Sequence, residues 1–298
     1  MLKVKNFSLT LNEKMVLENI NFSVERGKVL GIVGPSGMGK TSLIKSIVGI
    51  YKGTEGAIFL DGQDVYDNPI TKSKIAFVPD EHSSFYLITL KEIINYYKKI
   101  YENFDEDKFY RINKVFRIPT NRRFFQLSKG MKARVNLMMA FSLNADLLVL
   151  DEPTSGLDPI LKEKVLKIII NEVSTKEKLV IISSHNLGEL ERICDEVLIL
   201  NDGKIDYHNS LESMKKNIKK IQVAFDIPVY EEDLNINGIF NISQVGRVFT
   251  IITEKYDDNL KKQLKKFNPL FIDEIDLTLE EVFIYKLEKE GEYEEIFR

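Results

Sequence analysis

The chain of 298 residues has one cysteine, Cys194, and three histidines. A single cysteine excludes an internal disulfide framework and fits a reducing compartment. Because Cys194 ends an amphipathic segment at residues 190–194, we expect a packed side chain there rather than a reactive thiol. No stretch approaches the roughly 18 to 20 apolar residues of a membrane-spanning helix. Residues 1–7 alternate like a strand and contain no signal-peptide core, so we expect a cytoplasmic protein.

The charge balance gives no sign of a nucleic-acid partner. The formal net charge is −3, with 44% hydrophobic and 29% charged residues. These proportions are those of a globular protein with a substantial core. We therefore expect no nucleic acid among its partners.

Hydrophobic periodicity predicts an α/β fold with several parts. Short apolar runs alternate with helical patterns up to about residue 208, which favours a mostly parallel sheet covered by helices, with antiparallel strands at the N-terminus. A helical subdomain is expected at about 85–142, with one helical pattern running from Leu90 to about Arg117. Residues 209–298 predict a small α+β domain, in which Thr278 opens a final helix that ends near Glu290.

A glycine-rich turn follows the apolar strand at 29–33 and leads into a helical pattern. The turn matches G-x-x-x-x-G-K-[ST], and its residues, with the one that follows, are Gly34, Pro35, Ser36, Gly37, Met38, Gly39, Lys40, Thr41 and Ser42. Backbone N–H groups at such a helix start favour phosphate. Lys40 supplies a charge for the β- and γ-phosphates of a nucleotide, and the Thr41 hydroxyl can bind Mg²⁺.

Two acids follow a second apolar strand, at 147–150. Asp151 suits the Mg²⁺ shell, and Glu152 suits a general base that polarises the attacking water. Taken alone, the pair could equally cap a helix; after a phosphate loop it indicates catalysis. His185 follows the strand at 179–183, from which it could reach the γ-phosphate, whereas we assign no role to His82 or His208.

Ser128 precedes a helical pattern that begins at Lys129. A helix cap is one interpretation. The other is a second helix N-terminus that offers its backbone N–H groups to a phosphate held by another subunit.

Together these motifs resemble the nucleotide-binding subunit of the ABC transporter superfamily, over residues 2 to about 208. The set comprises Walker A (34–41), signature (127–131), Walker B (147–151) with Glu152, D-loop (155–158) and switch His185. The resemblance implies a head-to-tail homodimer or heterodimer that holds two ATP molecules. Each ATP would lie between Walker A of one subunit and Ser128 and Gly130 of the other, with Asp158 in the D-loop at the same junction.

Four positions depart from the family pattern. The signature has Lys129 and Met131, a form that resembles bacterial antibiotic and multidrug exporters. Asp80 stands where a glutamine usually follows the strand at 75–78, and an acid there can still bind Mg²⁺. Leu11 replaces the aromatic residue that stacks on adenine, with Phe7 nearby, so we expect modest ATP affinity and weak selectivity for adenine.

The resemblance implies a transport ATPase at the inner face of the cell membrane. Its partner would be a separately encoded integral-membrane permease, driven through the helical segment and functioning in export. The alternative is a non-transport ABC ATPase that acts on ribosomes or DNA. A GTPase or kinase is disfavoured because no Asn-Lys-x-Asp guanine motif is found.

Overall fold

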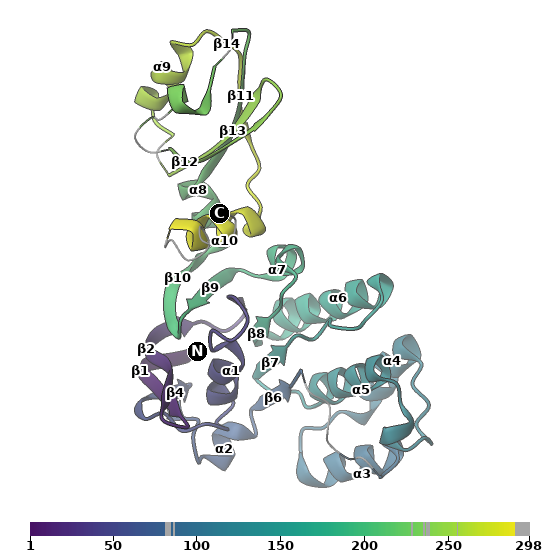
Figure 1. Ribbon diagram of the computed structural model, residues 1–298. Helices are drawn as coiled ribbons and strands as arrows, with labels where there is room; N and C mark the ends of the chain where they lie inside the picture. The colour runs from purple at the N-terminus through teal and green to yellow at the C-terminus, as the bar shows by residue number, and fades with distance from the viewer. Residues whose placement is uncertain are drawn as a thin grey trace. The chain divides into compact units, whose positions relative to one another are not determined.

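The computed structural model describes residues 1–80, 85, 87–227, 229–234, 236, 239–254 and 256–289. The chain folds into two compact units, Met1–His208 and Asn209–Arg298, whose elements are labelled in Figure 1. Among the described residues, no helix combines the length and the apolar character that crossing a bilayer requires. His82 lies outside the described residues.

The first unit begins with an antiparallel sheet of strand order β2-β1-β4-β5. Its strands are β1 (Leu2–Leu11), β2 (Lys14–Val24), β4 (Glu55–Leu60) and β5 (Gln63–Asp64). Ile20, Phe22 and Val24 are buried and the residues between them are exposed. This alternation is what a sheet with one covered face requires. The antiparallel N-terminal strands predicted from the sequence are confirmed.

A second, six-stranded sheet has the order β10-β9-β3-β8-β7-β6. Its strands are β3 (Val29–Val33), β6 (Ile75–Val78), β7 (Leu147–Asp151), β8 (Leu179–Ser183), β9 (Glu196–Asn201) and β10 (Lys204–Ser210). The pairs β9–β3, β3–β8, β8–β7 and β7–β6 are all parallel. The predicted mostly parallel sheet is confirmed, and all of β3, β7 and β8 is buried because both faces are covered.

Helix α1 (Lys40–Ile47) contributes to the core that the two sheets share. Its buried residues Leu43, Ile44 and Ile47 belong to one cluster with Leu147 and Val149 of β7. Short helix α2 (Pro69–Lys72) precedes β6. Packing in this core therefore fixes the end of β3 and the start of α1. The phosphate loop is the segment that joins them.

Helices α6 (Pro159–Lys176) and α7 (Leu187–Ile193) pack on β8 and β3 respectively. Cys194 directly follows α7, and a Cβ built at Gly31 of β3 would lie 2.9 Å from its Sγ. The thiol is buried, and burial raises its pKa far above the usual range. Cys194 is thus a packing residue, as its sequence setting predicted.

Helices α3 (Leu90–Ile100), α4 (Glu106–Phe116), η1 (Phe124–Gln126) and α5 (Lys129–Ser142) lie together at one side of this unit (Figure 1). The single helical pattern predicted from Leu90 to Arg117 is wrong, because the chain leaves the helical conformation at Tyr101. Asp105 then starts a new helix by accepting a hydrogen bond from the Lys108 N–H at 2.7 Å.

The second unit contains an antiparallel sheet of order β12-β13-β11-β14. Its elements are α8 (Leu211–Asn217), β11 (Lys219–Phe225), η2 (Glu231–Leu234), β12 (Ile239–Val245), β13 (Val248–Thr253), α9 (Asp258–Lys265), β14 (Pro269–Ile275) and α10 (Leu279–Lys289). Strand β12 was not predicted. Thr278 caps α10, exchanging backbone and side-chain hydrogen bonds with Glu281. The predicted helix end at Glu290 lies outside the described residues.

Candidate nucleotide site

The phosphate loop joins β3 to α1 and lies tight against its neighbours. A Cβ at Gly34 would lie 2.2 Å from the carbonyl oxygen of Leu200, which is closer than any side chain allows. Gly39 has φ +98°, and a Cβ there would approach Leu17 to 2.9 Å. Only glycine fits both positions, so the loop can curl and leave the first N–H groups of α1 open to an anion.

Lys40 is the first residue of α1 and is buried. Its ammonium donates hydrogen bonds to the loop carbonyls of Gly34, at 2.6 Å, and Pro35, at 2.8 Å. Burial lowers the pKa of Lys40, whereas the carboxylates of Glu152 and Asp151 act in the opposite direction. The loop thus holds a desolvated positive charge among its own oxygens.

A hollow of about 290 Å³ opens beside this loop. It is lined by most of the residues predicted for nucleotide, metal and catalysis, and by one other, Val16 of β2: Val16, Ser36, Gly37, Gly39, Lys40, Thr41, Ser42, Asp80, Asp151, Glu152 and His185. Gly34, Pro35 and Met38 belong to the same loop but are not among these lining residues. The structure therefore gathers segments more than a hundred residues apart in the sequence.

Asp151 is held by a serine that the sequence analysis did not single out. Ser183, the last residue of β8, pairs in register with Asp151, the last residue of β7. Its hydroxyl donates to Asp151 Oδ1 at 2.5 Å, and both side chains are buried. The sequence feature that could have identified Ser183 is its position as a polar residue at the end of an apolar strand. Ser183 fixes the rotamer of the carboxylate predicted to bind Mg²⁺.

Glu152 follows β7 in a left-handed backbone conformation, φ +51°. Its Oε1 is buried and has no hydrogen-bond partner among the described residues, although His185 Nε2 lies 3.4 Å away. Burial raises the pKa of Glu152, while His185 opposes the shift. A carboxylate whose basicity is increased by desolvation is suited to accept a proton.

Ser128, Gly130 and Asp158 do not line this hollow. The Ser128 hydroxyl accepts the Met131 N–H at 3.3 Å and caps α5, and Asp158 caps α6 through the Leu161 N–H. A Cβ at Gly130 would lie 3.2 Å from the Gly156 carbonyl oxygen. The signature and the D-loop are therefore neighbours, and they form a second group apart from the phosphate loop.

Comparison with known proteins identifies this arrangement. The family model described as ABC transporter matches residues 17–155. The chain is 29% identical over 286 residues to the ABC transporter ATP-binding protein YtrB of Bacillus subtilis (strain 168), covering 96% of this chain and 98% of that protein. A solved structure titled as the ATP-binding subunit of an ABC transporter is 30% identical, covers 72% of this chain and 92% of its own, and superposes with a TM-score of 0.67.

The chain belongs to the family of ABC transporter ATP-binding subunits. As an ABC ATPase, it binds and hydrolyses ATP and uses Mg²⁺. A dimeric ATP-binding cassette in a post-hydrolysis state with ADP and phosphate shares its fold, at 24% identity and a TM-score of 0.63 over 71% of this chain and 99% of the other.

The residues of this ABC ATPase suit Mg²⁺. Thr41, Asp80 and Asp151 bring one hydroxyl and two carboxylates to the same hollow, and hard oxygen ligands are those that Mg²⁺ prefers. No group of three or more His, Cys, Asp or Glu side chains within the described part of the chain is arranged for a metal ion. Mg²⁺ prefers octahedral coordination, so oxygens of the nucleotide and of water would complete the three protein ligands, as is usual at phosphate sites.

No aromatic side chain is among the described residues that line the hollow of this ABC ATPase. Phe7 is 2% exposed and packs in the core of the first unit, where Leu11 packs against the same cluster. Val16 is the apolar residue that lines the hollow. The ring of Phe7 is thus committed to the core and is not available to a base.

We expect this ABC ATPase to bind ATP and GTP with dissociation constants within about tenfold of each other, because a base–aromatic contact worth about 1–3 kcal/mol is missing. Competition of both nucleotides against a fluorescent analogue measures the ratio. Leu11→Tyr should strengthen ATP binding, with Leu9→Met of the same strand, buried in the core, as the control. Far tighter binding of ATP than of GTP by the unaltered chain would contradict this expectation.

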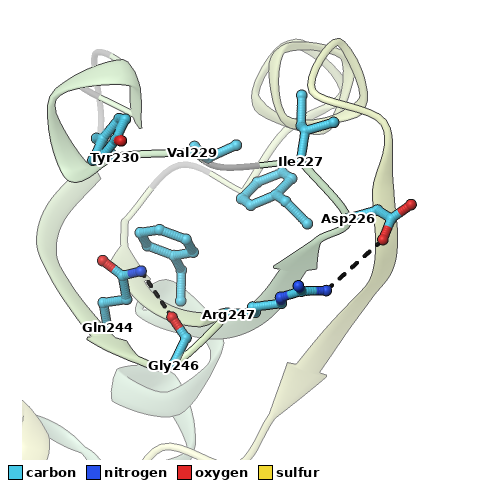
Figure 2. A pocket seen from close by; sticks show the side chains of 9 residues that line it. Asp226, Ile227, Val229, Tyr230, Gln244, Gly246 and Arg247 are labelled. Atoms are coloured by element: carbon cyan, nitrogen blue, oxygen red, sulfur yellow. Dashed lines mark hydrogen bonds and ion pairs between the residues drawn. The ribbon is translucent and has the colours of Figure 1, made fainter.

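A second hollow, of about 330 Å³, lies in the C-terminal unit (Figure 2). Phe225 and Phe249 are buried and are among the residues that line it. Arg247 reaches Asp226 at 3.9 Å, with both side chains largely exposed. None of the predicted site residues lines this hollow.

Proposed function

We propose that the chain powers a separately encoded membrane permease as one half of an ATP-sandwich dimer, at the inner face of the cell membrane. The observation that carries the proposal is the separation of the site into two groups. Lys40, Glu152 and His185 line one hollow, while Ser128 and Gly130 lie outside it beside the D-loop. A second subunit in head-to-tail orientation would bring each group to the other.

In this dimer, different residues of one chain would bind the phosphates, accept a proton and hold Mg²⁺. Lys40 and the open N–H groups of α1 bind the β- and γ-phosphates. Glu152 accepts a proton from the attacking water, and His185 beside it contacts the γ-phosphate. Thr41, Asp80 and Asp151 would hold Mg²⁺, which when bound would supply positive charge beside the phosphates.

Across the junction, the first turn of α5 would complete the site. The N–H groups at the start of a helix have no intrahelical partner. Ser128 occupies one of them, that of Met131, and those of Lys129 and Gly130 lie in the same first turn. A γ-phosphate of the partner chain would be stabilised there by N–H groups and by the helix dipole.

The helical subdomain offers a surface suited to a permease. Tyr96, Tyr97 and Tyr101 form a chain of ring contacts with centroids 6.4 and 5.3 Å apart. Burial raises the pKa of Tyr97 to about 12, whereas Tyr96 and Ile100 are about half exposed. Exposed aromatic and aliphatic side chains over a packed base are typical of protein contacts. Export is the direction that the Lys129 and Met131 signature favours.

Mixing two inactive variants tests the shared site. Lys40→Ala disables the phosphate loop and Ser128→Arg disables the signature, so each variant alone should lose ATPase activity. A mixed dimer keeps one intact site, formed from the loop of one chain and the signature of the other. Random pairing should therefore restore about a quarter of the wild-type rate, measured by phosphate release at saturating ATP.

The control is a mixture of Lys40→Ala with Glu152→Gln, which disable the same half of the site. No mixed dimer of these two chains has an intact site, so the rate should stay at background. If the Lys40→Ala and Ser128→Arg mixture also remained inactive, or if Ser128→Arg alone kept full activity, the sandwich would be excluded. Co-purification of a membrane protein with the tagged chain tests the permease partner.

A further inference from the structure

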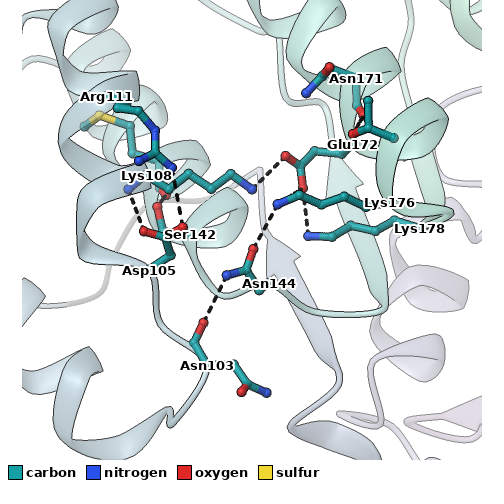
Figure 3. Close-up of polar contacts among 12 residues, drawn as sticks. Asn103, Asp105, Lys108, Arg111, Ser142, Asn144, Asn171, Glu172, Lys176 and Lys178 are labelled. Atoms are coloured by element: carbon teal, nitrogen blue, oxygen red, sulfur yellow. Dashed lines mark hydrogen bonds and ion pairs between the residues drawn. The ribbon is translucent and has the colours of Figure 1, made fainter.

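Helices α4 and α6 and the start of β8 meet at a buried cluster of charges (Figure 3). Lys108 Nζ of α4 lies 2.7 Å from Glu172 Oε1 of α6, and Lys178 Nζ, just before β8, lies 2.8 Å from Glu172 Oε2. The three side chains, called here the Glu172 cluster, are 9%, 3% and 8% exposed. Lys176 is more distant, at 3.9 Å, and 41% exposed.

The charges in the Glu172 cluster shift one another's pKa values. Burial alone would raise the pKa of Glu172, but Lys108 and Lys178 outweigh this effect and lower it. Burial lowers the pKa of Lys108 to about 8, and Glu172 opposes that shift. The carboxylate is therefore charged at neutral pH, and two buried cations rely on it as their counter-charge.

The cluster is connected to the signature through α4. Arg134 of α5 donates to the carbonyl oxygen of Phe116, the last residue of α4, at 2.9 Å. The same guanidinium donates to the carbonyl oxygen of Gly130 at 3.1 Å. A shift of α4 therefore moves the acceptor on which Arg134 and the first turn of α5 depend.

The two other elements of the cluster begin or end at residues of the nucleotide site. Helix α6 starts at its cap Asp158 in the D-loop and carries Glu172 near its far end. Strand β8 starts after Lys178 and ends at Ser183, which holds Asp151. Glu172 is thus the point at which the D-loop helix, the strand leading to His185 and the helical subdomain are joined.

We propose that the Glu172 cluster is a positioning device: it fixes the helical subdomain against α6 and β8, so that Ser128 and Gly130 meet the nucleotide of the partner chain. This proposal rests on the sandwich dimer. Ion pairs of this kind contribute little net stability, since well-packed apolar residues of the same volume are often equally stable. What the cluster adds is one orientation: a buried carboxylate between two cations cannot slide without leaving a charge unpaired.

The triple variant Lys108→Met/Glu172→Leu/Lys178→Met separates orientation from stability. We expect its melting temperature to match or exceed that of the wild type. Single-chain ATP affinity, measured with Ser128→Arg present to block pairing, should stay within about twofold of its parent. In a Glu152→Gln background, the affinity of ATP-dependent dimerisation, measured by sedimentation, should weaken by about tenfold. If the cluster had only a structural role, dimerisation would be as strong as in the parent chain whenever the melting temperature was unchanged.

The matched control is Glu163→Gln, on the same helix α6, where Glu163 is paired at the surface with Arg192. It should leave melting, ATP affinity and dimerisation unchanged. A triple variant that pairs as tightly as its parent overturns the proposal, and so does one that fails to fold, because the cluster would then serve the fold itself. If the parent chain does not dimerise in the presence of ATP, the proposed function is contradicted, and not the role of the Glu172 cluster.

Discussion

Glu152→Gln is expected to lower the ATPase rate by about 10²- to 10⁴-fold and to leave ATP binding intact. Glu152 lines the hollow beside Lys40, and its Oε1 is buried without a hydrogen-bond partner in the described residues. An amide has the same shape but cannot take a proton from water. It also removes a negative charge from the place where the γ-phosphate would lie, so binding should be equal or tighter.

An ATP-bound dimer should accumulate in this variant, since hydrolysis is the step that reopens it. Gel filtration with and without ATP measures the dimer, and phosphate release measures turnover. The control is Glu177→Gln, at the exposed end of α6, which should behave as wild type. A Glu152→Gln chain that hydrolyses ATP at the normal rate would remove Glu152 from the role of base.

The second large effect is expected for Lys40→Ala, which should weaken ATP binding by about 10- to 100-fold. A charged hydrogen bond is worth about 1.5–3 kcal/mol, and alanine offers neither charge nor donor to the phosphates. We expect the stability of the fold to change little in this variant. Burial lowers the pKa of Lys40, which means that the charged ammonium is less favourable in the folded chain than in the unfolded one, so its removal should have little effect on the melting temperature.

Titration with a fluorescent ATP analogue gives the affinity, and a thermal melt checks the fold. Lys45→Ala is the matched control, because Lys45 lies on the same helix but faces the ring of Tyr51 at 5.8 Å. It should bind ATP normally. Equal affinity of the Lys40→Ala chain and the wild type would show that the ammonium does not contact the phosphates.

Local patterns carried most of what the sequence could predict. The phosphate loop, the acids after β7 and the cap of α10 each depend on residues within a few positions of one another, and the structure has them in the expected form. The break between α3 and α4 was also local, because Asp105 is a typical helix cap. It was missed because apolar side chains at helical spacing continue across it.

Contacts between distant segments could not be predicted. The approach of Gly130 to Gly156 and the pairing of Lys108 with Glu172 join residues that no spacing rule relates. Lys108 and Glu172 each look like an ordinary solvated charge in the sequence. Ser183 had a weak signal, since it is the polar end of an apolar strand, but its partner depends on the order of β7 and β8 in the sheet.

The packing of Cys194 against Gly31 has a practical consequence. The chain contains no other cysteine, and this thiol is buried and resists ionisation. Since the thiolate is the species that alkylating reagents attack, the native chain should remain unlabelled. A cysteine introduced at an exposed position away from the nucleotide site, such as Lys98, would then carry the only probe of each chain. Distances between subunits could be followed by spectroscopy during turnover.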